Sequence, residues 1–284
     1  MGARDWLKQR FYDWVDARLD PDFLAKYKAM PVHSNEYGYD SFGFHRDDAK
    51  AAAVVARFFH DVYFRVESQG AQQVPDGRVL LIANHSGQLP FDAVGIISAC
   101  LFDRDPPRMP RAMIERFIPT LPFASYLLAR WGQIIGTPEN CARLLEQEEA
   151  ILVFPEGARG ISKPFTQRYQ LQEFGHGFMR LALETRSPIV PVAVVGAEEQ
   201  APAVNVRPIA RLVGAPAFPL MPIPPFFPIV PLPTRYRIYF GEPLRFEGDP
   251  DDDDEVMEEK VKTVKNRIQS MLRVGLAERR HVFW

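Results

Sequence analysis

The sequence has little cysteine, no excess of basic charge and no secretory leader, and each of these absences excludes a class of protein. Its two cysteines, Cys100 and Cys141, lie in apolar segments that are predicted to be helical. We therefore expect small buried thiols in a reducing compartment and no disulfide framework. A net charge of −2 provides no basic excess for nucleic acid. No basic-then-apolar leader with a small-residue cleavage site is found, so we do not expect secretion.

What remains is ordinary globular composition, with 46% hydrophobic and 25% charged residues in a chain of 284. The chain has no internal repeat and no Gly/Ser linker. We expect three segments: an N-terminal helical region over residues 1–62, an α/β domain over 63–248, and a C-terminal helix over 249–284 packed on that domain.

One charge-free run stands out, at residues 215–233, where 8 of 19 residues are proline. Its length alone would suggest a membrane span, but proline breaks helices and a broken backbone cannot satisfy its hydrogen bonds in lipid. Two interpretations stay open: an irregular loop packed on the core, or an apolar lip that contacts a membrane or an acyl chain.

An amphipathic helix is predicted over residues 4–19. Such a helix usually docks on its own protein, which is the interpretation we prefer, and the alternative is that it lies in a bilayer interface. The apolar stripe consists of Leu7, Phe11, Trp14 and Val15, and Trp6 beside it makes a fifth apolar residue.

Beyond the first helices, short apolar strands alternate with helical segments, which predicts a mostly parallel central sheet flanked by helices. Strands are expected at residues 63–67, 79–83, 111–114, 150–154, 189–195 and 235–240. Helices are expected at residues 47–63, 93–102, 119–130, 138–148, 173–185 and 255–276.

Polar residues follow two of these strands directly, and in a parallel sheet such residues meet in one crevice at the carboxyl ends of the strands. His85 leaves the strand at 79–83, and Asp92 is near enough to hold one of its ring nitrogens, as a carboxylate does for a general base. After the strand at 150–154, Glu156 faces the same crevice and Arg159 offers a forked cation. The alternative is a structural histidine with Asp92 as a helix cap, and the His–Asp pair alone is weak evidence for a catalytic site.

With these motifs at its strand ends, the sequence resembles the glycerolipid and lysophospholipid acyltransferases over roughly residues 64–245. The matching motifs are Asn84-His85 with Asp92, Phe154-Pro155-Glu156-Gly157 with Arg159, and the strand bracketed by Pro188 and Pro191. The resemblance implies a glycerol-phosphate-acyltransferase-like fold, and acyl transfer from a thioester to a lipid hydroxyl.

The resemblance further implies that His85 is the general base and that Asp92 orients it, without a covalent acyl-enzyme. Oxyanion donors are sought among the backbone amides near Ser86-Gly87 or in the Glu156-Gly157 turn. The remaining predicted substrate-binding residues are Asn84, Phe154, Pro155 and Arg159. We expect no cofactor beyond an acyl-CoA or acyl carrier protein co-substrate, no metal, a cytoplasmic location and peripheral contact with a membrane.

Two departures from the family pattern narrow the prediction. Six residues separate His85 from Asp92 where the family has four, and we expect Pro90 to let the loop bulge so that the two side chains still meet. In the family's second motif, Thr137 replaces a phosphate-binding arginine, which favours a neutral or differently charged lipid alcohol as acceptor. Two alternatives remain: an acyl-thioester hydrolase, and a non-catalytic lipid-binding protein of the same fold.

Overall fold

The centre of the fold is a seven-stranded sheet with the strand order β1-β9-β6-β2-β5-β3-β4. It is seen in a computed structural model that describes residues 3–86, 90–115, 123–157, 159–160, 163–202, 204–206, 208–209, 219–220 and 231–283. All neighbouring strands are parallel except β6 and β9, so the predicted mostly parallel sheet is confirmed. The strands are β1 (Glu67–Gln69), β2 (Val79–Ala83), β3 (Arg111–Ile114), β4 (Ile134–Ile135), β5 (Ala150–Val153), β6 (Ile189–Val195) and β9 (Arg237–Phe240). A separate pair joins β7 (Val204–Asn205) to β8 (Pro219–Leu220).

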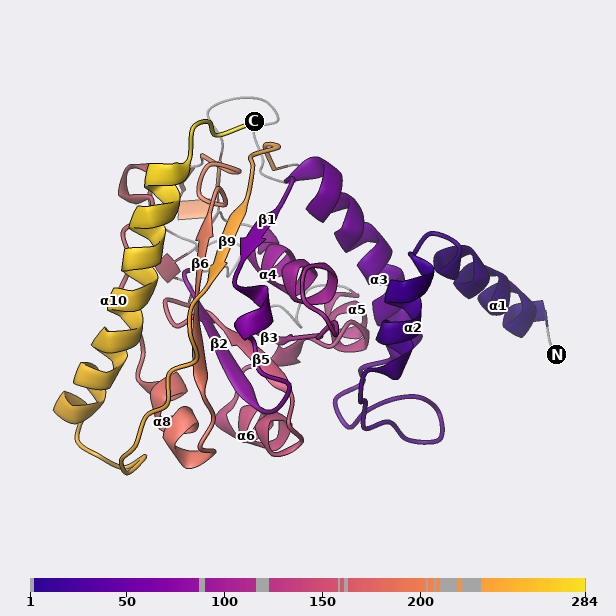
Figure 1. Cartoon of the computed structure of the whole chain (residues 1–284), viewed down its shortest axis with the longest axis horizontal. Helices are drawn as coiled ribbons and strands as arrows, with labels where there is room; N and C mark the ends of the chain where they lie inside the picture. The colour runs from indigo at the N-terminus through magenta and orange to yellow at the C-terminus, as the bar shows by residue number, and fades with distance from the viewer. Residues whose placement is uncertain are drawn as a thin grey trace.

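Helices cover both faces of this sheet (Figure 1). Helices α6, α8 and α10 pack on one face, where α10 contributes an apolar stripe at three- and four-residue spacing that includes Val261, Val264 and Ile268. Helix α4 packs on the other face, with α3 beyond it. The helices are α1 (Ala3–Asp16), α2 (Pro21–Ala29), α3 (Arg46–Phe58), α4 (Phe91–Phe102), α5 (Ala124–Arg130), α6 (Pro138–Glu146), α8 (Gly177–Glu184) and α10 (Asp254–Glu278).

The three strands at the middle of the sheet explain why the central region is the best predicted. Strands β2 and β6 are buried along their whole length and β5 nearly so, because each is a continuous apolar run covered by helices on both faces. Cys100 and Cys141 are buried free thiols, as predicted.

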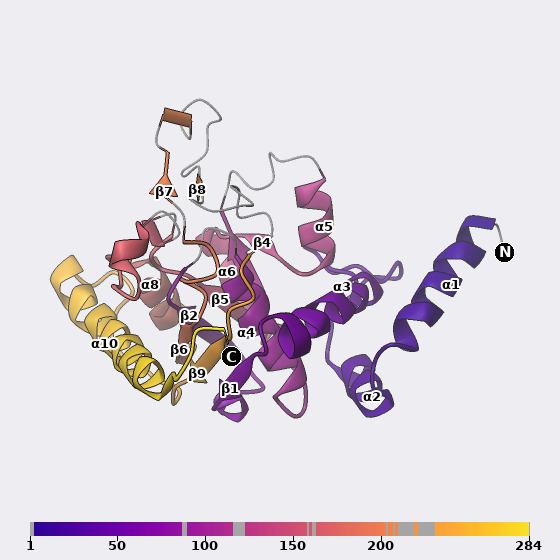
Figure 2. The ribbon, with the colours of Figure 1, turned by 90° about the horizontal axis from the view of Figure 1, so that it is seen from above.

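The N-terminal helix differs from our preferred prediction, because its apolar stripe is not docked on the protein. Val15 is buried, but Trp6, Leu7, Phe11 and Trp14 are each 46–60% exposed. Figure 2 shows α1 projecting from the body of the molecule, beyond α2 and α3. The docking prediction is therefore wrong for four of these five apolar residues.

The predicted strand at residues 63–67 is also wrong, since the strand here begins only at Glu67. Residues Phe59–Tyr63 instead prolong α3 as a π-helical turn. The reason is an aromatic cluster: Phe59, Tyr63 and Phe64 pack on one another, and Phe64 stacks on Tyr236 with ring centroids 4.3 Å apart. The apolar residues here pack a helical turn and do not form a strand.

Other predicted features fall partly or wholly outside the described residues. These are most of the proline-rich run at 215–233, the start of the helix predicted at 119–130, and Gly87. In the part of the chain that the structure describes, no helix has the length and apolarity needed to cross a membrane.

Candidate active site

His85 is placed at the carboxyl edge of the sheet by the residue before it. Asn84 follows β2 and is buried, and its side-chain amide donates to the backbone oxygen of Val194 (3.1 Å) while accepting from the backbone nitrogen of the same residue (2.8 Å). Asn84 thus extends the pairing of β2 with β6 by one residue. What the structure shows is a positioning role, and the substrate contact predicted for Asn84 stays a prediction.

His85 and Asp92 meet despite the longer spacing between them. The Nδ1 atom of His85 lies 2.7 Å from Oδ2 of Asp92, which also accepts from the backbone nitrogen of Ser86 at 2.9 Å. The histidine side chain is 13% exposed and the carboxylate is completely buried in the first turn of α4, where the helix dipole favours negative charge. Burial and the nearby charge of Asp92 raise the pKa of Tyr236 well above its usual value. The predicted pair is confirmed as a contact.

The ring of His85 is held from a second side by Phe154, which follows β5. The two rings stack with centroids 4.2 Å apart and an interplanar angle of 22°. With Nδ1 bonded to Asp92, the other ring nitrogen, Nε2, has no hydrogen bond to any group in the described part of the chain. The imidazole is therefore oriented through one nitrogen, and the other is available for chemistry.

Glu156 fixes the backbone of the histidine loop, although we predicted it to face a substrate. Its buried carboxylate accepts from the backbone nitrogen of His85 (2.9 Å) through one oxygen and from that of Gln172 (2.8 Å) through the other. The Phe-Pro-Glu-Gly turn and the Asn-His turn are thereby tied together. A direct contact of Glu156 with substrate stays a prediction.

Sequence reasoning missed Lys163, a buried cation beside this carboxylate. Its Nζ lies 2.8 Å from Oε1 of Glu198 and 3.7 Å from Oε2 of Glu156. Burial raises the pKa of Glu198 to about 7, and Lys163 acts against that rise. Lysine is rarely buried without partners, but nothing in the neighbouring sequence showed that Glu198, on a distant segment, would pair with Lys163.

Two of the backbone amides predicted as oxyanion donors are already engaged. The Ser86 amide bonds to Asp92, and the Gly157 amide donates to the backbone oxygen of Phe154 at 3.0 Å. Gly157 has a φ of +54°, so this tight turn suits glycine. Both N–H groups therefore have acceptors within the protein, and their role as oxyanion donors stays a prediction, while Gly87 lies outside the described residues.

The other predicted site residues lie at the same edge of the sheet. The Pro155 backbone oxygen accepts from the Gly175 amide. Arg159 is exposed and its guanidinium bonds to Glu173 at 2.8 Å. Thr137 follows β4 and caps α6, accepting from the backbone nitrogen of Asn140. Among the described residues, no group of three or more His, Cys, Asp or Glu side chains is arranged to hold a metal ion.

Gly160 offers a test of how tightly the histidine is held. A Cβ at this position would lie 2.8 Å from the Cβ of His85 and 3.0 Å from that of Glu156, so Gly160→Ala is expected to push the loop by a fraction of an ångström. We expect the rate of any reaction that uses His85 to fall by about 10-fold, because small displacements of a positioned group are costly.

The control is Gly175→Ala, since a Cβ there meets nothing within 4 Å. Both variants should unfold at similar temperatures, and only Gly160→Ala should lose turnover. Equal activity in the two variants would mean that the loop accommodates the added methyl group and that His85 is not rigidly placed.

Known proteins share this fold and site region. Residues 65–195 match the acyltransferase family. An uncharacterized protein of Mycobacterium tuberculosis is 38% identical over 264 residues, covering 88% of this chain and 73% of that protein. A probable 1-acyl-sn-glycerol-3-phosphate acyltransferase of Mycoplasma pneumoniae is 27% identical over 157 residues, covering 52% of this chain and 55% of that protein.

Among solved structures, the 1-acyl-sn-glycerophosphate acyltransferase PlsC of Thermotoga maritima is similar in fold, with a TM-score of 0.54, 13% identity and 98% of each chain covered. The region that matches the acyltransferase family, residues 65–195, includes both turns that enclose the histidine, Asn84-His85 and Phe154-Gly157. The chain therefore belongs to the acyltransferase family.

Proposed function

We propose that this protein transfers a fatty acyl group from an acyl thioester to the hydroxyl of a lysophospholipid or related glycerolipid. The observation that carries the proposal is the 2.7 Å contact between Nδ1 of His85 and a buried carboxylate of Asp92 at the carboxyl edge of the sheet. Ligands bind at this edge in α/β folds, and a histidine oriented through Nδ1 presents Nε2 as a general base.

In the proposed reaction, Nε2 of His85 takes the proton from the acceptor hydroxyl as its oxygen attacks the thioester carbonyl carbon. A C–O bond forms, and the tetrahedral intermediate then collapses with loss of the C–S bond. The imidazolium returns the proton to the leaving thiolate, giving an ester and a free thiol. Asp92 would stabilise the imidazolium between these two proton transfers.

The proposal involves no acyl group attached to the protein. Both cysteines are buried, and burial raises the pKa of the Cys100 thiol to about 12 and that of Cys141 to about 11. Such thiols are neutral and inaccessible, whereas a cysteine nucleophile reacts as the exposed thiolate. Direct attack by the acceptor is the simpler route.

The charges around the crevice favour an acceptor without a terminal phosphate. Thr137 stands where a phosphate-binding arginine would be expected, and its hydroxyl caps α6. Lys163 is buried between Glu156 and Glu198, and Arg159 is paired with Glu173. These cations already have carboxylate partners, so a phosphate would have to compete with those partners.

The acceptor is tested by supplying the full chain with acyl-CoA and, in parallel reactions, lysophosphatidic acid, a lysophospholipid with a neutral or zwitterionic head, or a monoacylglycerol. We expect ester formation with the acceptors that lack a terminal phosphate, and less with lysophosphatidic acid. Repeating the reactions with acyl carrier protein as donor identifies the thioester. Release of free fatty acid at the same rate in every reaction would instead identify a hydrolase, and no thioester consumption would leave lipid binding alone.

We also propose that α1 brings the protein to the membrane that holds its substrates. Its four exposed apolar residues form one face with basic side chains beside them: Arg18 lies over the Trp14 ring at 3.5 Å and Arg10 over the Trp6 ring at 4.9 Å. Aromatic rings beside cationic side chains suit the interface between headgroups and acyl chains.

Replacing Trp6, Leu7, Phe11 and Trp14 together by serine is expected to lower the vesicle-bound fraction by about 10-fold or more. Each buried methylene contributes only about 0.8 kcal/mol, so several side chains must act together. Vesicle flotation measures the bound fraction. The control is the double variant Val256→Ser/Val274→Ser, which removes exposed apolar residues on α10, far from α1 (Figure 1). Binding that collapsed in moderate salt would contradict apolar insertion as the main contribution.

A further inference from the structure

A cavity of about 510 Å³ lies at the amino ends of the parallel strands, whereas His85 lies at their carboxyl ends. Its lining includes Asp76 just before β2, Arg111 at the start of β3 and Glu149 just before β5, which are all at the amino ends of parallel strands. The five residues of β2 span about 16 Å, and His85 lies beyond their far end. The cavity is therefore separate from the crevice of the proposed reaction, and its volume is typical of small-molecule sites.

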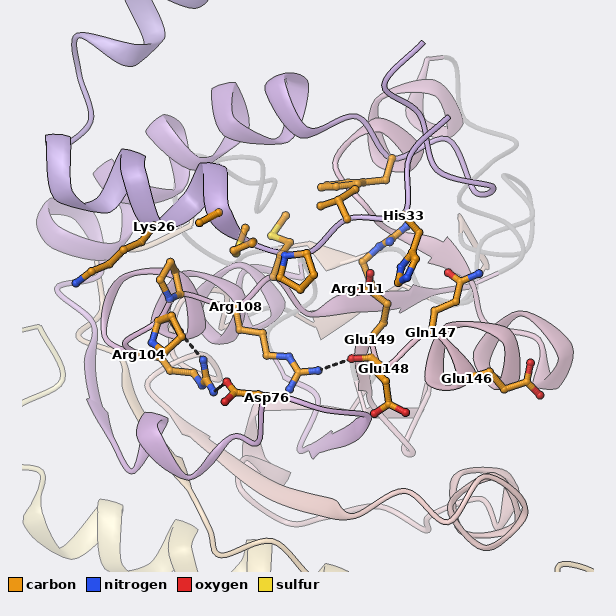
Figure 3. Close-up of a pocket in the computed structure, with 18 residues that line it drawn as sticks. Lys26, His33, Asp76, Arg104, Arg108, Arg111, Glu146, Gln147, Glu148 and Glu149 are labelled. Atoms are coloured by element: carbon orange, nitrogen blue, oxygen red, sulfur yellow. Dashed lines mark hydrogen bonds and ion pairs between the residues drawn. The ribbon is translucent and has the colours of Figure 1, made fainter. Parts of the chain in front are cut away.

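The N-terminal segment forms one wall of this cavity and the sheet forms the other (Figure 3). The wall residues are mostly apolar, whereas guanidinium groups enter from the sheet side. The apolar lining comes from Ala29, Met30, Pro31, Val32, Phe44, Pro106, Pro107 and Met109.

Among the described arginines that line the cavity, Arg108 is one of two whose hydrogen bonding is incomplete. It is only 9% exposed, and its Nη2 donates to the backbone oxygen of Glu148 at 2.9 Å, but its buried Nη1 has no hydrogen-bond partner. Burial lowers the pKa of Arg108 to about 10. A buried charged group with an unmade hydrogen bond is costly, so each such group calls for an explanation.

Arg111 repeats this pattern on the same cavity. It is 2% exposed; its Nη1 pairs with Asp40 at 2.8 Å and its Nε donates to the backbone oxygen of Gly132, yet its buried Nη2 has no partner. Arg104 also lines the cavity but is different, because all three of its side-chain nitrogens are bonded. Of the three described arginines that line the cavity, Arg108 and Arg111 are thus the two that have a buried nitrogen without a partner.

The acids of the lining do not complete these arginines. Asp76 pairs with Arg104, and Glu148 pairs with Arg78. The carboxylate of Glu149 makes no hydrogen bond or ion pair with the described residues and lies within electrostatic reach of Arg108 and Arg111. Burial nonetheless raises the pKa of Glu149, against the effect of both guanidinium charges. Glu149 is the acid that a bound anion would meet.

We infer that this cavity binds a small amphipathic anion, with a carboxylate or phosphate head beside the guanidinium groups of Arg108 and Arg111 and a short apolar body against the N-terminal wall. Guanidinium groups are the preferred partners of such oxyanions, and each of these two has a buried nitrogen whose positive charge no hydrogen-bond acceptor offsets. Because the wall comes from α2 and the residues after it, the ligand would also hold the N-terminal segment on the domain.

The test is calorimetric titration of the full chain with octanoate, with inorganic phosphate, and with octan-1-ol as a neutral chain. We expect octanoate to bind, phosphate to bind more weakly for lack of an apolar body, and octan-1-ol not to bind. Arg108→Gln should lower the affinity for octanoate at least about 10-fold, as expected for a charge-assisted hydrogen bond. Arg57→Gln, which removes an arginine that pairs with Asp61 outside the cavity, should leave the affinity unchanged.

Glu149→Gln keeps the inference testable if Arg108→Gln fails to fold. Removing a like charge should strengthen octanoate binding several-fold, and an unchanged or weaker affinity would overturn the proposal. Amide hydrogen exchange locates the ligand: we expect protection at residues 29–33 and 146–149. Protection at the His85 edge with undiminished affinity in Arg108→Gln would mean that octanoate occupies the acyl crevice, and no binding by either anion would leave the cavity to solvent; both results would overturn the inference.

Discussion

His85→Ala is expected to lower acyl transfer by about 100-fold or more while leaving the fold intact. The side chain is the group that would take the acceptor proton, and a positioned general base contributes roughly 10²–10⁴ in rate. Its ring contributes little to the core, since its main contacts are Asp92 and the Phe154 ring at the edge of the sheet. Initial rates with acyl-CoA and lipid acceptor, measured beside thermal unfolding, give both quantities.

The matched control is His176→Ala. His176 is also flanked by carboxylates, with Nε2 3.0 Å from Glu258 and Nδ1 3.4 Å from Asp254, but these partners belong to α10 and His176 has no contact with Asp92. We expect near-normal turnover from this variant. Near-normal turnover from His85→Ala as well would remove His85 from the reaction.

Asp92→Asn is expected to reduce turnover by about 10²–10⁴-fold, because an amide cannot replace both functions of the carboxylate. Oδ2 accepts from the imidazole and from the Ser86 amide, and Oδ1 accepts from the backbone nitrogen of Ala93. An asparagine has one acceptor oxygen for these three donors and no charge to stabilise the imidazolium. The loss should appear in kcat, with KM for the acyl donor little changed.

A second His–Asp pair provides the comparison for Asp92. Asp103 lies just beyond the other end of α4, with Oδ2 3.1 Å from Nε2 of His60, and this pair has no place in the proposed reaction. Asp103→Asn should leave kcat unchanged, in a comparison made at a temperature where both variants are folded. If Asp92→Asn also kept its kcat, the carboxylate would be a helix-capping group, and a different residue would have to orient the base.

The central strands could be predicted from the sequence because each is a continuous apolar run bounded by turn residues. Helix α2 was missed although its start signal is in the sequence: Asp20 caps the helix and Pro21 occupies its first position. The two residues of β4 could not be predicted, since so short a strand exists only by pairing with β3. The strand at 63–67 failed because aromatic packing on Tyr236, more than 160 residues away, decides the local backbone.

The candidate site divides in the same way. His85 and Asp92 are close in sequence and carry a motif, so their contact could be expected. The ties of Glu156 to the His85 backbone and of Lys163 to Glu198 join segments that only the folded sheet brings together. The exposure of Trp6 and Trp14 could not be predicted either, because an amphipathic stripe looks the same whether its partner is the protein or a membrane.

The most direct test of the account follows a radiolabelled acyl group from its thioester in a single turnover, with the protein in excess and acceptor lipid in vesicles. Label is measured over time in three pools: lipid ester, free fatty acid and protein. The account predicts that label passes from thioester to lipid ester with none on the protein, and that His85→Ala stops the transfer. Label that appears first on the protein, or that ends as free fatty acid whether or not acceptor is present, would contradict it.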